Sequence, residues 1–217
     1  MIPISPATCD RLAATVRQCR ICVDPPRAGR PLGHAPRPIL QISPTARICI
    51  AGQAPGVRAN ESGVPFSDPS GVRLREWMGV SDAQFYDARK VAILPMGFCF
   101  PGLDAHGSDL PPRRECAPAW REPLLQQLPA LRLLLLVGSY AQRWHLPRIP
   151  GLPPALQRLG VNDTVRHWRA IYDAQAQPRV LALPHPSWRN SGWLKRNPWF
   201  EGEVLPMLRQ QVADVLA

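Results

Sequence analysis

Three short segments of the sequence carry residues that could bind or transform a ligand, and each follows an apolar run. The first is GQAPG at residues 52–56, after which we expect a polar loop rather than a helix. It lacks the Lys-Ser/Thr ending of a phosphate-binding loop and the three-glycine spacing of a dinucleotide-binding loop. The other two are PMGFCFPG at residues 95–102 and PHPSWRN at residues 184–190. A different kind of binding site must explain them.

Cysteine thiols form a second candidate group. Cys19 and Cys22 make a C-x-x-C pair at the end of an expected helix, and Cys99 and Cys116 bracket residues 100–115. Six cysteines in a chain with no secretion signal argue for a metal or reactive thiols before disulfides. Four thiolates suit either a [4Fe–4S] cluster or a structural zinc ion. A bound metal would fix both cysteine pairs to the sheet. The third alternative, beside the cluster and zinc, is that the cysteines bind no metal.

Four unbroken apolar runs closed by Gly or Pro predict strands that are buried on both faces. They are Arg47–Ala51, Val91–Pro95, Leu131–Val137 and Arg179–Leu183. Between and around them, helical patterns cover Pro6–Cys19, Gly71–Met78, Cys116–Leu128, Ser139–Leu146, Thr164–Tyr172 and Asn197–Leu216. The alternation predicts an α/β fold, a three-layer α/β/α sandwich with a central four-stranded, mainly parallel sheet. Residues 1–217 are expected to form a single domain.

The predicted sheet brings the three unusual segments together. In open parallel sheets, ligands bind beyond the carboxyl ends of the strands. The segments follow the first, second and fourth strands, so they should meet at one edge. The third strand runs into GSYAQRWHL, an ordinary glycine turn that enters a helix, and Pro25–Pro44 reads as a wrapping loop.

These motifs resemble those of the uracil-DNA glycosylase superfamily, which combines a Gly-polar-x-Pro-Gly/Tyr loop with a His-Pro-Ser loop. The sequence has GQAPG at residues 52–56 and His-Pro-Ser at residues 185–187. It is most similar to the iron–sulfur families 4 and 5, in which Gly-x-Pro-Phe follows the first motif, as GVPF does at residues 63–66. The cysteine layout is also similar, and it implies that Cys19, Cys22, Cys99 and Cys116 hold a [4Fe–4S] cluster with a structural role.

The resemblance implies base excision repair: hydrolysis of the N-glycosidic bond of uracil or a related deaminated base in DNA. Such an enzyme flips the nucleotide out of the stack and holds its base in a pocket. Phe66 would stack on the base, unless it is a core residue under the loop. The residues expected around the base are Gly52, Gln53, Ala54, Pro55, Gly56, Phe66, Met96 and Gly97.

Catalysis would depend on donors aimed at the departing base, which becomes an anion as the bond breaks. Neutral His185 is the principal expected donor, and the backbone N–H groups of Gln53 and Ala54 could add others. A structural histidine that caps the strand is the alternative. Asp68 and Glu61 are the candidate general bases.

DNA contacts are implied for the segment around the second motif. Ser187, Arg189 and Asn190 lie where the family contacts phosphates, and Trp188 lies where a side chain could wedge into the duplex. Packing with other tryptophans is the alternative for Trp188. Lys195 and Arg196 extend the basic cluster, which would otherwise be a solvated face.

Two departures from the family pattern concern chemistry and base choice. Many members have Asp or Asn in the first motif to position water, whereas this chain has Ala54. Families 4 and 5 also lack a carboxylate there, so its absence does not imply an inactive protein, but it leaves the general base unidentified. Related enzymes also read the uracil edge with an Asn near the end of the second strand, whereas residues 94–98 are LPMGF. The preferred base is therefore open.

Composition is consistent with a globular nucleic-acid-binding protein. The formal net charge is +10, almost all of the positive charge is arginine, and 45% of residues are hydrophobic. A basic surface suits a polyanion, although coding bias toward Ala, Arg and Pro is the alternative. The sequence has no signal pattern and no run long enough to span a bilayer, so we expect a cytoplasmic monomer without a membrane partner.

Three functions remain in contention. A DNA glycosylase is the first. A binding module that recognises damaged or single-stranded nucleic acid without cleaving it is the second, and Ala54 and Pro95 are compatible with it. A hydrolase acting on free nucleotides is the third, and the net charge and the Trp188/Arg189 pair count against it.

Overall fold

A computed structural model describes residues 5–24, 26–27 and 29–217, so Pro25, at the start of the predicted wrapping loop, lies outside the described residues. Its four strands are β1 (Ile48–Ala51), β2 (Val91–Ile93), β3 (Leu133–Val137) and β4 (Arg179–Leu183). They form one sheet in the order β2-β1-β3-β4, and every pair is parallel. The predicted α/β fold is confirmed.

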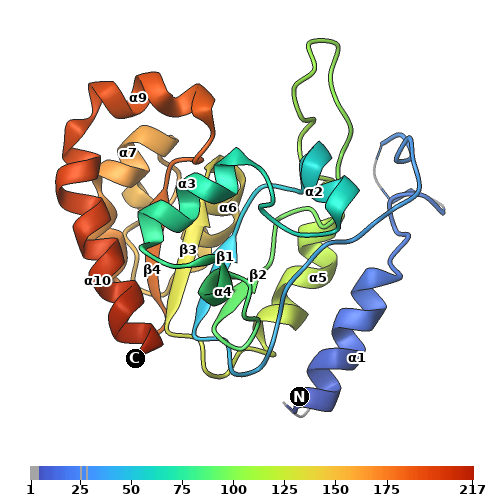
Figure 1. Cartoon of the computed structure of the whole chain (residues 1–217), viewed down its shortest axis with the longest axis horizontal. Coiled ribbons are helices and arrows are strands. Elements are labelled where there is room, and N and C mark those ends of the chain that lie inside the picture. Colours follow the sequence, from blue (N-terminus) through green and yellow to red (C-terminus); the bar gives the residue numbers. More distant parts are fainter. Residues whose placement is uncertain (1–4, 25, 28) are drawn as a thin grey trace.

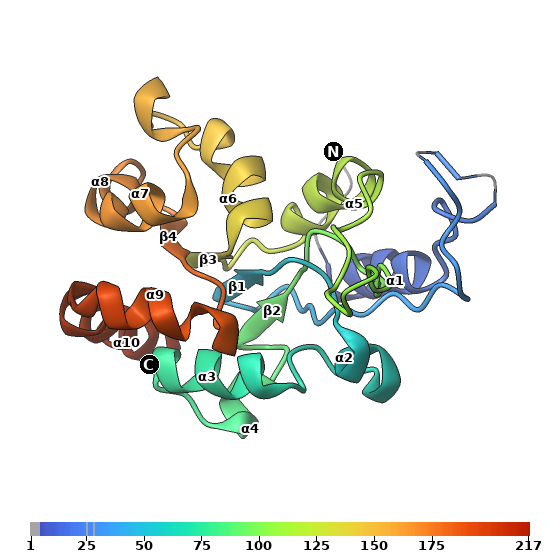
Figure 2. The ribbon, with the colours of Figure 1, turned by 90° about the horizontal axis from the view of Figure 1, so that it is seen from above.

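Helices lie on both faces of the sheet (Figures 1 and 2). Their bounds are α1 Pro6–Arg17, α2 Val57–Ser62, α3 Pro69–Met78, α4 Asp82–Phe85, α5 Cys116–Leu125, α6 Ser139–His145, α7 Val161–Arg166, α8 Trp168–Asp173, α9 Ser191–Arg196 and α10 Leu205–Leu216. Short 3-10 turns lie at Leu146–Arg148, Pro154–Leu156 and Trp188–Asn190, and a π-helical turn, Phe200–Val204, leads into α10. None of the described helices is long and apolar enough to cross a membrane.

Alternation along the strands creates two cores, because successive side chains point to opposite faces. In β1, Ile48 and Ile50 pack with α3, α4 and α10, whereas Cys49 and Ala51 pack with α1, α5 and α6. All four β1 residues are fully buried, as expected for a strand covered on both sides. The sheet is therefore a rigid platform whose carboxyl edge can hold a site.

The structure corrects three predicted elements. The polar loop expected after residue 56 is wrong, because α2 begins at Val57, with Gly56 as its N-cap, and ends at Gly63 in a left-handed conformation. The predicted helix over Thr164–Tyr172 is interrupted at His167 and forms α7 and α8. The predicted C-terminal helix from Asn197 instead starts with a π-helical turn. In the first case, glycines at both ends delimit a six-residue helix. In the other two cases, a short turn divides a helical pattern that reads as continuous in the sequence.

A buried arginine links the helix layer to the end of β2. Arg121 on α5 is fully buried, and its Nη1 donates to the carbonyl oxygens of Leu94, at 2.5 Å, and Pro95, at 3.4 Å. Its Nε and Nη2 have no hydrogen-bond partner among the described residues. Burial lowers the pKa of Arg121 to about 10. The arginine thus holds the chain where β2 leaves the sheet.

Candidate active site

A cavity of about 480 Å³ opens at the carboxyl edge of the sheet, a size typical of small-molecule pockets. It lies where the loops after β1, β2 and β4 meet. The residues that were predicted for the site and that line this cavity are Gly52, Gln53, Ala54, Pro55, Gly56, Phe66, Asp68, His185, Ser187, Trp188 and Arg189. The structure thus brings the first and second motifs into one pocket.

Phe66 presents its ring to the cavity from a left-handed backbone conformation, with φ of 54°. This conformation is strained for a residue with a side chain. A Cβ at Gly52 would lie 3.1 Å from Phe66 Cζ, so the glycine of the first motif leaves room for the ring. Phe66 is half-buried and meets the fully buried Phe85 edge-on, with ring centroids 6.2 Å apart. Phe66 therefore both contacts the core and faces the pocket.

Neighbouring groups hold the Phe66 backbone in place. The Phe66 carbonyl oxygen accepts hydrogen bonds from the Tyr86 hydroxyl, at 3.1 Å, and from Arg75 Nη1, at 3.4 Å. A Cβ on Gly71 would lie 1.8 Å from the same oxygen. Gly71 of α3 is thus a position where only glycine fits, and the strained turn depends on it.

His185 follows β4 and projects into the cavity from a half-buried position. Its Nδ1 accepts a hydrogen bond from the Ser187 backbone N–H at 3.2 Å. Burial lowers the pKa of His185 below 6.5, and Asp68 partly opposes that effect. The imidazole is therefore neutral, and its proton is on Nε2 because Nδ1 is an acceptor. This leaves one N–H to donate.

Two polar side chains hold the loop that carries His185. Asn190 Nδ2 donates to the His185 carbonyl oxygen at 2.7 Å. Arg73 of α3 donates to the Ser187 carbonyl oxygen at 3.0 Å and contacts the Ser191 hydroxyl. Asn190, predicted as a phosphate contact, does not line the cavity, and its amide is bonded to the loop backbone.

The rim of the cavity is aromatic and basic. Trp188 is 71% exposed, and Arg189 lies 5.7 Å from its ring centre. The other aromatic side chains of this region pack together instead: Trp193 and Trp199 contact each other and Phe200. Lys195 and Arg196 lie in the following helix, α9, and do not line the cavity.

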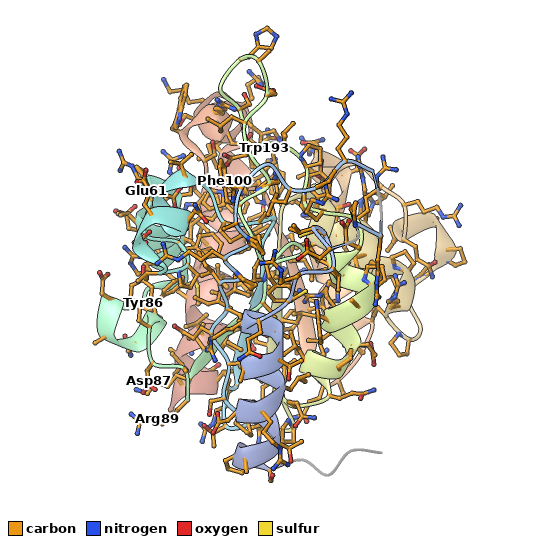
Figure 3. All side chains as sticks on the ribbon, turned by 90° about the vertical axis from the view of Figure 1, so that its right-hand side faces the viewer. Glu61, Tyr86, Asp87, Arg89, Phe100 and Trp193 are labelled. Carbon is orange, nitrogen blue, oxygen red and sulfur yellow. The ribbon has the colours of Figure 1, made fainter. Side chains whose placement is uncertain are left out.

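Met96 and Gly97, predicted to contact the base, do not line the cavity. Met96 is buried in the core on the α5 side of the sheet. The backbone N–H groups of the two residues donate to the carbonyl oxygens of Gly52 and Gln53, both at 2.9 Å. They brace the first motif from behind. Glu61, a candidate base, is exposed on α2 and also does not line the cavity (Figure 3).

Sequence reasoning did not identify one carboxylate in the cavity, Asp109. It lies in the long loop between Cys99 and Cys116, together with Leu103 and Gly107, which also line the cavity. That loop projects beyond the sheet edge beside α2 (Figure 1). The segment at residues 95–102 predicted that this loop starts at the site. No spacing rule indicated which residues of the loop return to the cavity.

The four predicted metal-binding cysteines lie in one region away from the cavity lining. Cys22 and Cys99 pack together with Leu32, and the Trp120 indole N–H donates to Cys19 Sγ at 3.2 Å. Burial, followed by the proximity of the other cysteines, raises the pKa of Cys99 to about 12. Within the described part of the chain, no three Cys, His, Asp or Glu residues are arranged as a formed metal site. The donor set is present, but the coordination geometry is not.

A comparison with protein-family models agrees with the cavity and the fold. The model of the uracil DNA glycosylase superfamily matches residues 40–209. This range contains all four strands, both motifs and every residue that lines the cavity. Cys19 and Cys22 precede it. Because the match covers most of the chain, the protein belongs to the uracil DNA glycosylase superfamily, whose members are typically DNA N-glycosylases.

Proposed function

We propose that the protein hydrolyses the N-glycosidic bond of uracil or a related deaminated base in DNA. The observation that carries the proposal is the meeting of an aromatic ring, Phe66, and a neutral imidazole, His185, in one cavity. A flipped base requires both a stacking surface and a donor for the charge that develops on it. The superfamily match supplies the reaction class.

The base would enter between the two motifs and stack on Phe66. Stacking of a base on an aromatic ring contributes about 1–3 kcal/mol. Gln53 is the only side-chain amide among the described residues that line the cavity. An amide both donates and accepts hydrogen bonds, so Gln53 can contact the edge of more than one base. This environment suits a deaminated base without restricting the choice to uracil.

His185 would stabilise the leaving group. As the bond to C1′ breaks, its electron pair remains on the base nitrogen, and negative charge spreads to the carbonyl oxygens of the base. The Nε2–H of the neutral imidazole donates to that charge without giving up its proton. Backbone N–H groups of the first motif, at Gln53 and Ala54, would supply further donors at the other side of the base.

The exposed rim would bind the DNA. Trp188 is free to insert beside the flipped nucleotide, because 71% of its surface is exposed. Ser187 and Arg189 would contact the adjacent phosphates. Asn190 would contribute by keeping the loop in place through its hydrogen bond to the His185 carbonyl oxygen. Lys195 and Arg196 would extend the basic surface along α9. Such phosphate contacts position the protein without specifying sequence.

The cysteines would form a structural metal centre. We propose a [4Fe–4S] cluster held by Cys19, Cys22, Cys99 and Cys116, with zinc as the alternative. The other three thiols are close enough to Cys99 to raise its pKa, and four thiolates are the donor set that a cubane requires. The centre would tie the N-terminal segment to the loop that follows β2.

Base release under single-turnover conditions tests the glycosidase proposal. Excess protein is mixed with oligonucleotides that each carry one uracil, hypoxanthine or xanthine, and the abasic product is cleaved by alkali. Release of at least one of these bases, with none from the matched undamaged strand, is expected. Tight binding of the lesion without release would instead support a damage-binding module, for which Ala54 in place of an acidic residue is the structural argument.

A further inference from the structure

The long loop between Cys99 and Cys116 is an ordered hairpin that returns to the cavity. Residues 102 and 110 are joined by a hydrogen bond from the Leu110 N–H to the Gly102 carbonyl, at 2.9 Å. Leu103 and Asp109 pair as an antiparallel bridge. At the tip, the Asp104 carboxylate accepts hydrogen bonds from the backbone N–H groups of His106 and Ser108. This pairing fixes which residue of the loop faces the site.

The returning strand of this hairpin brings Asp109 against the first motif. A Cβ on Gly56 would lie 3.3 Å from Asp109 Oδ2, so the glycine leaves room for the carboxylate. Arg189 Nη1 donates to the Ser108 hydroxyl at 3.0 Å and joins the hairpin to the second motif. Asp109 therefore lines the same cavity as Phe66 and His185.

The other carboxylate of the cavity, Asp68, already has a structural role. It is the N-cap of α3, and its Oδ1 accepts a hydrogen bond from the Gly71 backbone N–H at 3.3 Å. By contrast, none of the described residues donates a hydrogen bond to the Asp109 carboxylate. Its two oxygens are available to a water molecule. Glu61 lies outside the cavity.

We propose that Asp109 is the general base of the reaction, a role that rests on the proposed glycosidase function. The ionised carboxylate accepts a proton from water as the water oxygen bonds to C1′ of the flipped nucleotide. The C1′–N bond breaks, and its electron pair leaves with the base anion, which His185 stabilises. The products are a C1′ hydroxyl, a protonated Asp109 and the base anion, which then takes up a proton.

The charges around Asp109 determine the pH at which it can act. Asp68 from the start of α3, Arg189 from the second motif, Arg58 from α2 and His185 after β4 line the same cavity. Asp109 is exposed to solvent, but the loss of water on the side that lines the cavity raises its pKa, Asp68 raises the pKa further, and Arg189 lowers it. The carboxylate therefore ionises at higher pH than an ordinary aspartate, which makes it a stronger proton acceptor.

The test measures single-turnover base release by Asp109→Asn at several pH values, with the uracil oligonucleotide or whichever of the three the wild type cleaves. Asparagine keeps the size of the side chain and removes its basicity. Loss of a general base typically slows a reaction about 10²–10⁴-fold. The acid limb of the pH–rate profile should also change, affinity for the DNA should stay the same, and Asp109→Glu should restore part of the rate.

Asp104→Asn is the matched control, because Asp104 caps the hairpin tip outside the cavity and keeps an acceptor oxygen as asparagine. Wild-type activity in Asp109→Asn would overturn the role of Asp109 and leave the glycosidase function intact. Equal losses of activity in both variants, with equal falls in melting temperature, would show that activity depends on the folding of the hairpin. That result would also overturn the role of Asp109. Failure of the wild type to release any of the three bases would reject the proposed function and this inference with it.

Discussion

The Ser187 backbone N–H points at Nδ1 of His185, 3.2 Å away. The bond spans only two residues, and Pro186 between them has no N–H of its own and a restricted φ. The His-Pro-Ser sequence thus sets the histidine tautomer locally, before any substrate binds. A donor that is already oriented requires no reorganisation during the reaction, which is the condition for effective stabilisation of an anion.

His185→Ala should therefore slow base release about 10²–10³-fold, the usual loss when one such donor is removed. DNA affinity should change little, because phosphate contacts supply most of it. Single-turnover rates at saturating protein, together with the melting temperature, measure both effects. If the variant is destabilised but each folded molecule retains full activity, His185 is a structural cap and the catalytic role fails.

Gly71→Ala should displace Phe66, because the added Cβ would lie 1.8 Å from the Phe66 carbonyl oxygen. Overpacking of this kind typically costs about 1–3 kcal/mol of stability. Base release should fall as well, since the ring faces the cavity. Urea unfolding and single-turnover rates provide the two measurements.

Gly202→Ala is the matched control for Gly71, because no atom outside its own helical turn lies within 4 Å of its added Cβ. Removing a helical glycine should raise stability by about 0.5–1 kcal/mol. If Gly71→Ala has wild-type stability and activity, the Phe66 turn does not depend on Gly71.

The pattern of the sequence predicts the fold and the two motifs well, because a buried parallel strand is a local apolar run. The ends of all four strands lie within two residues of the predicted ones. The sequence pattern fails where the position of a side chain depends on contacts with distant parts of the chain. Met96 directly follows the predicted second strand, yet its side chain is buried in the core, and its backbone N–H donates to the Gly52 carbonyl oxygen. Asp109 reaches the cavity through a hairpin whose path depends on the pairing with Leu103, and no periodicity indicates that.

DNA binding should depend strongly on salt, and Arg189, Lys195 and Arg196 should account for part of that dependence. Each phosphate contact contributes about one unit to the slope of log K against log salt concentration. Replacing all three by alanine should lower the slope by up to about three units. Fluorescence anisotropy between low and moderate salt measures it.

A triple variant at the opposite edge of the sheet is the control for charge alone. Arg89, Lys90 and Arg132 lie at the amino ends of β2 and β3, and Figure 3 shows Arg89 at that end. Their replacement by alanine removes the same formal charge and should leave the slope nearly unchanged. Equal slopes in the two variants would mean that the arginine excess acts only through net charge.

Protein purified without oxygen should be brown and contain about four irons per chain, as one cubane with four thiolates requires. Cys99→Ser should lose the colour and the iron, and should be less soluble. Cys9→Ala should keep both, because Cys9 packs in the core beside α5 and lies outside the four-cysteine group. Stoichiometric zinc without iron would reject the cluster.

The stability of the protein should fall as the pH drops below about 6.5, owing in part to His145. This side chain is buried, and its Nε2 has no hydrogen-bond partner among the described residues. Burial, Arg121 and Arg148 lower its pKa well below the ordinary value of 6.5. Below that value the unfolded chain binds a proton that the folded chain does not, so acid favours unfolding. One such group changes the free energy of unfolding by about 1.4 kcal/mol per pH unit.

His145→Leu should flatten this dependence, measured as the free energy of urea unfolding between pH 5 and pH 8. The slope should not vanish, because burial also lowers the pKa of His185. His106→Leu, at the exposed tip of the 102–110 hairpin, is the control and should retain the full slope. A His145→Leu protein with the wild-type slope would show that His145 is not the group that acid protonates on unfolding.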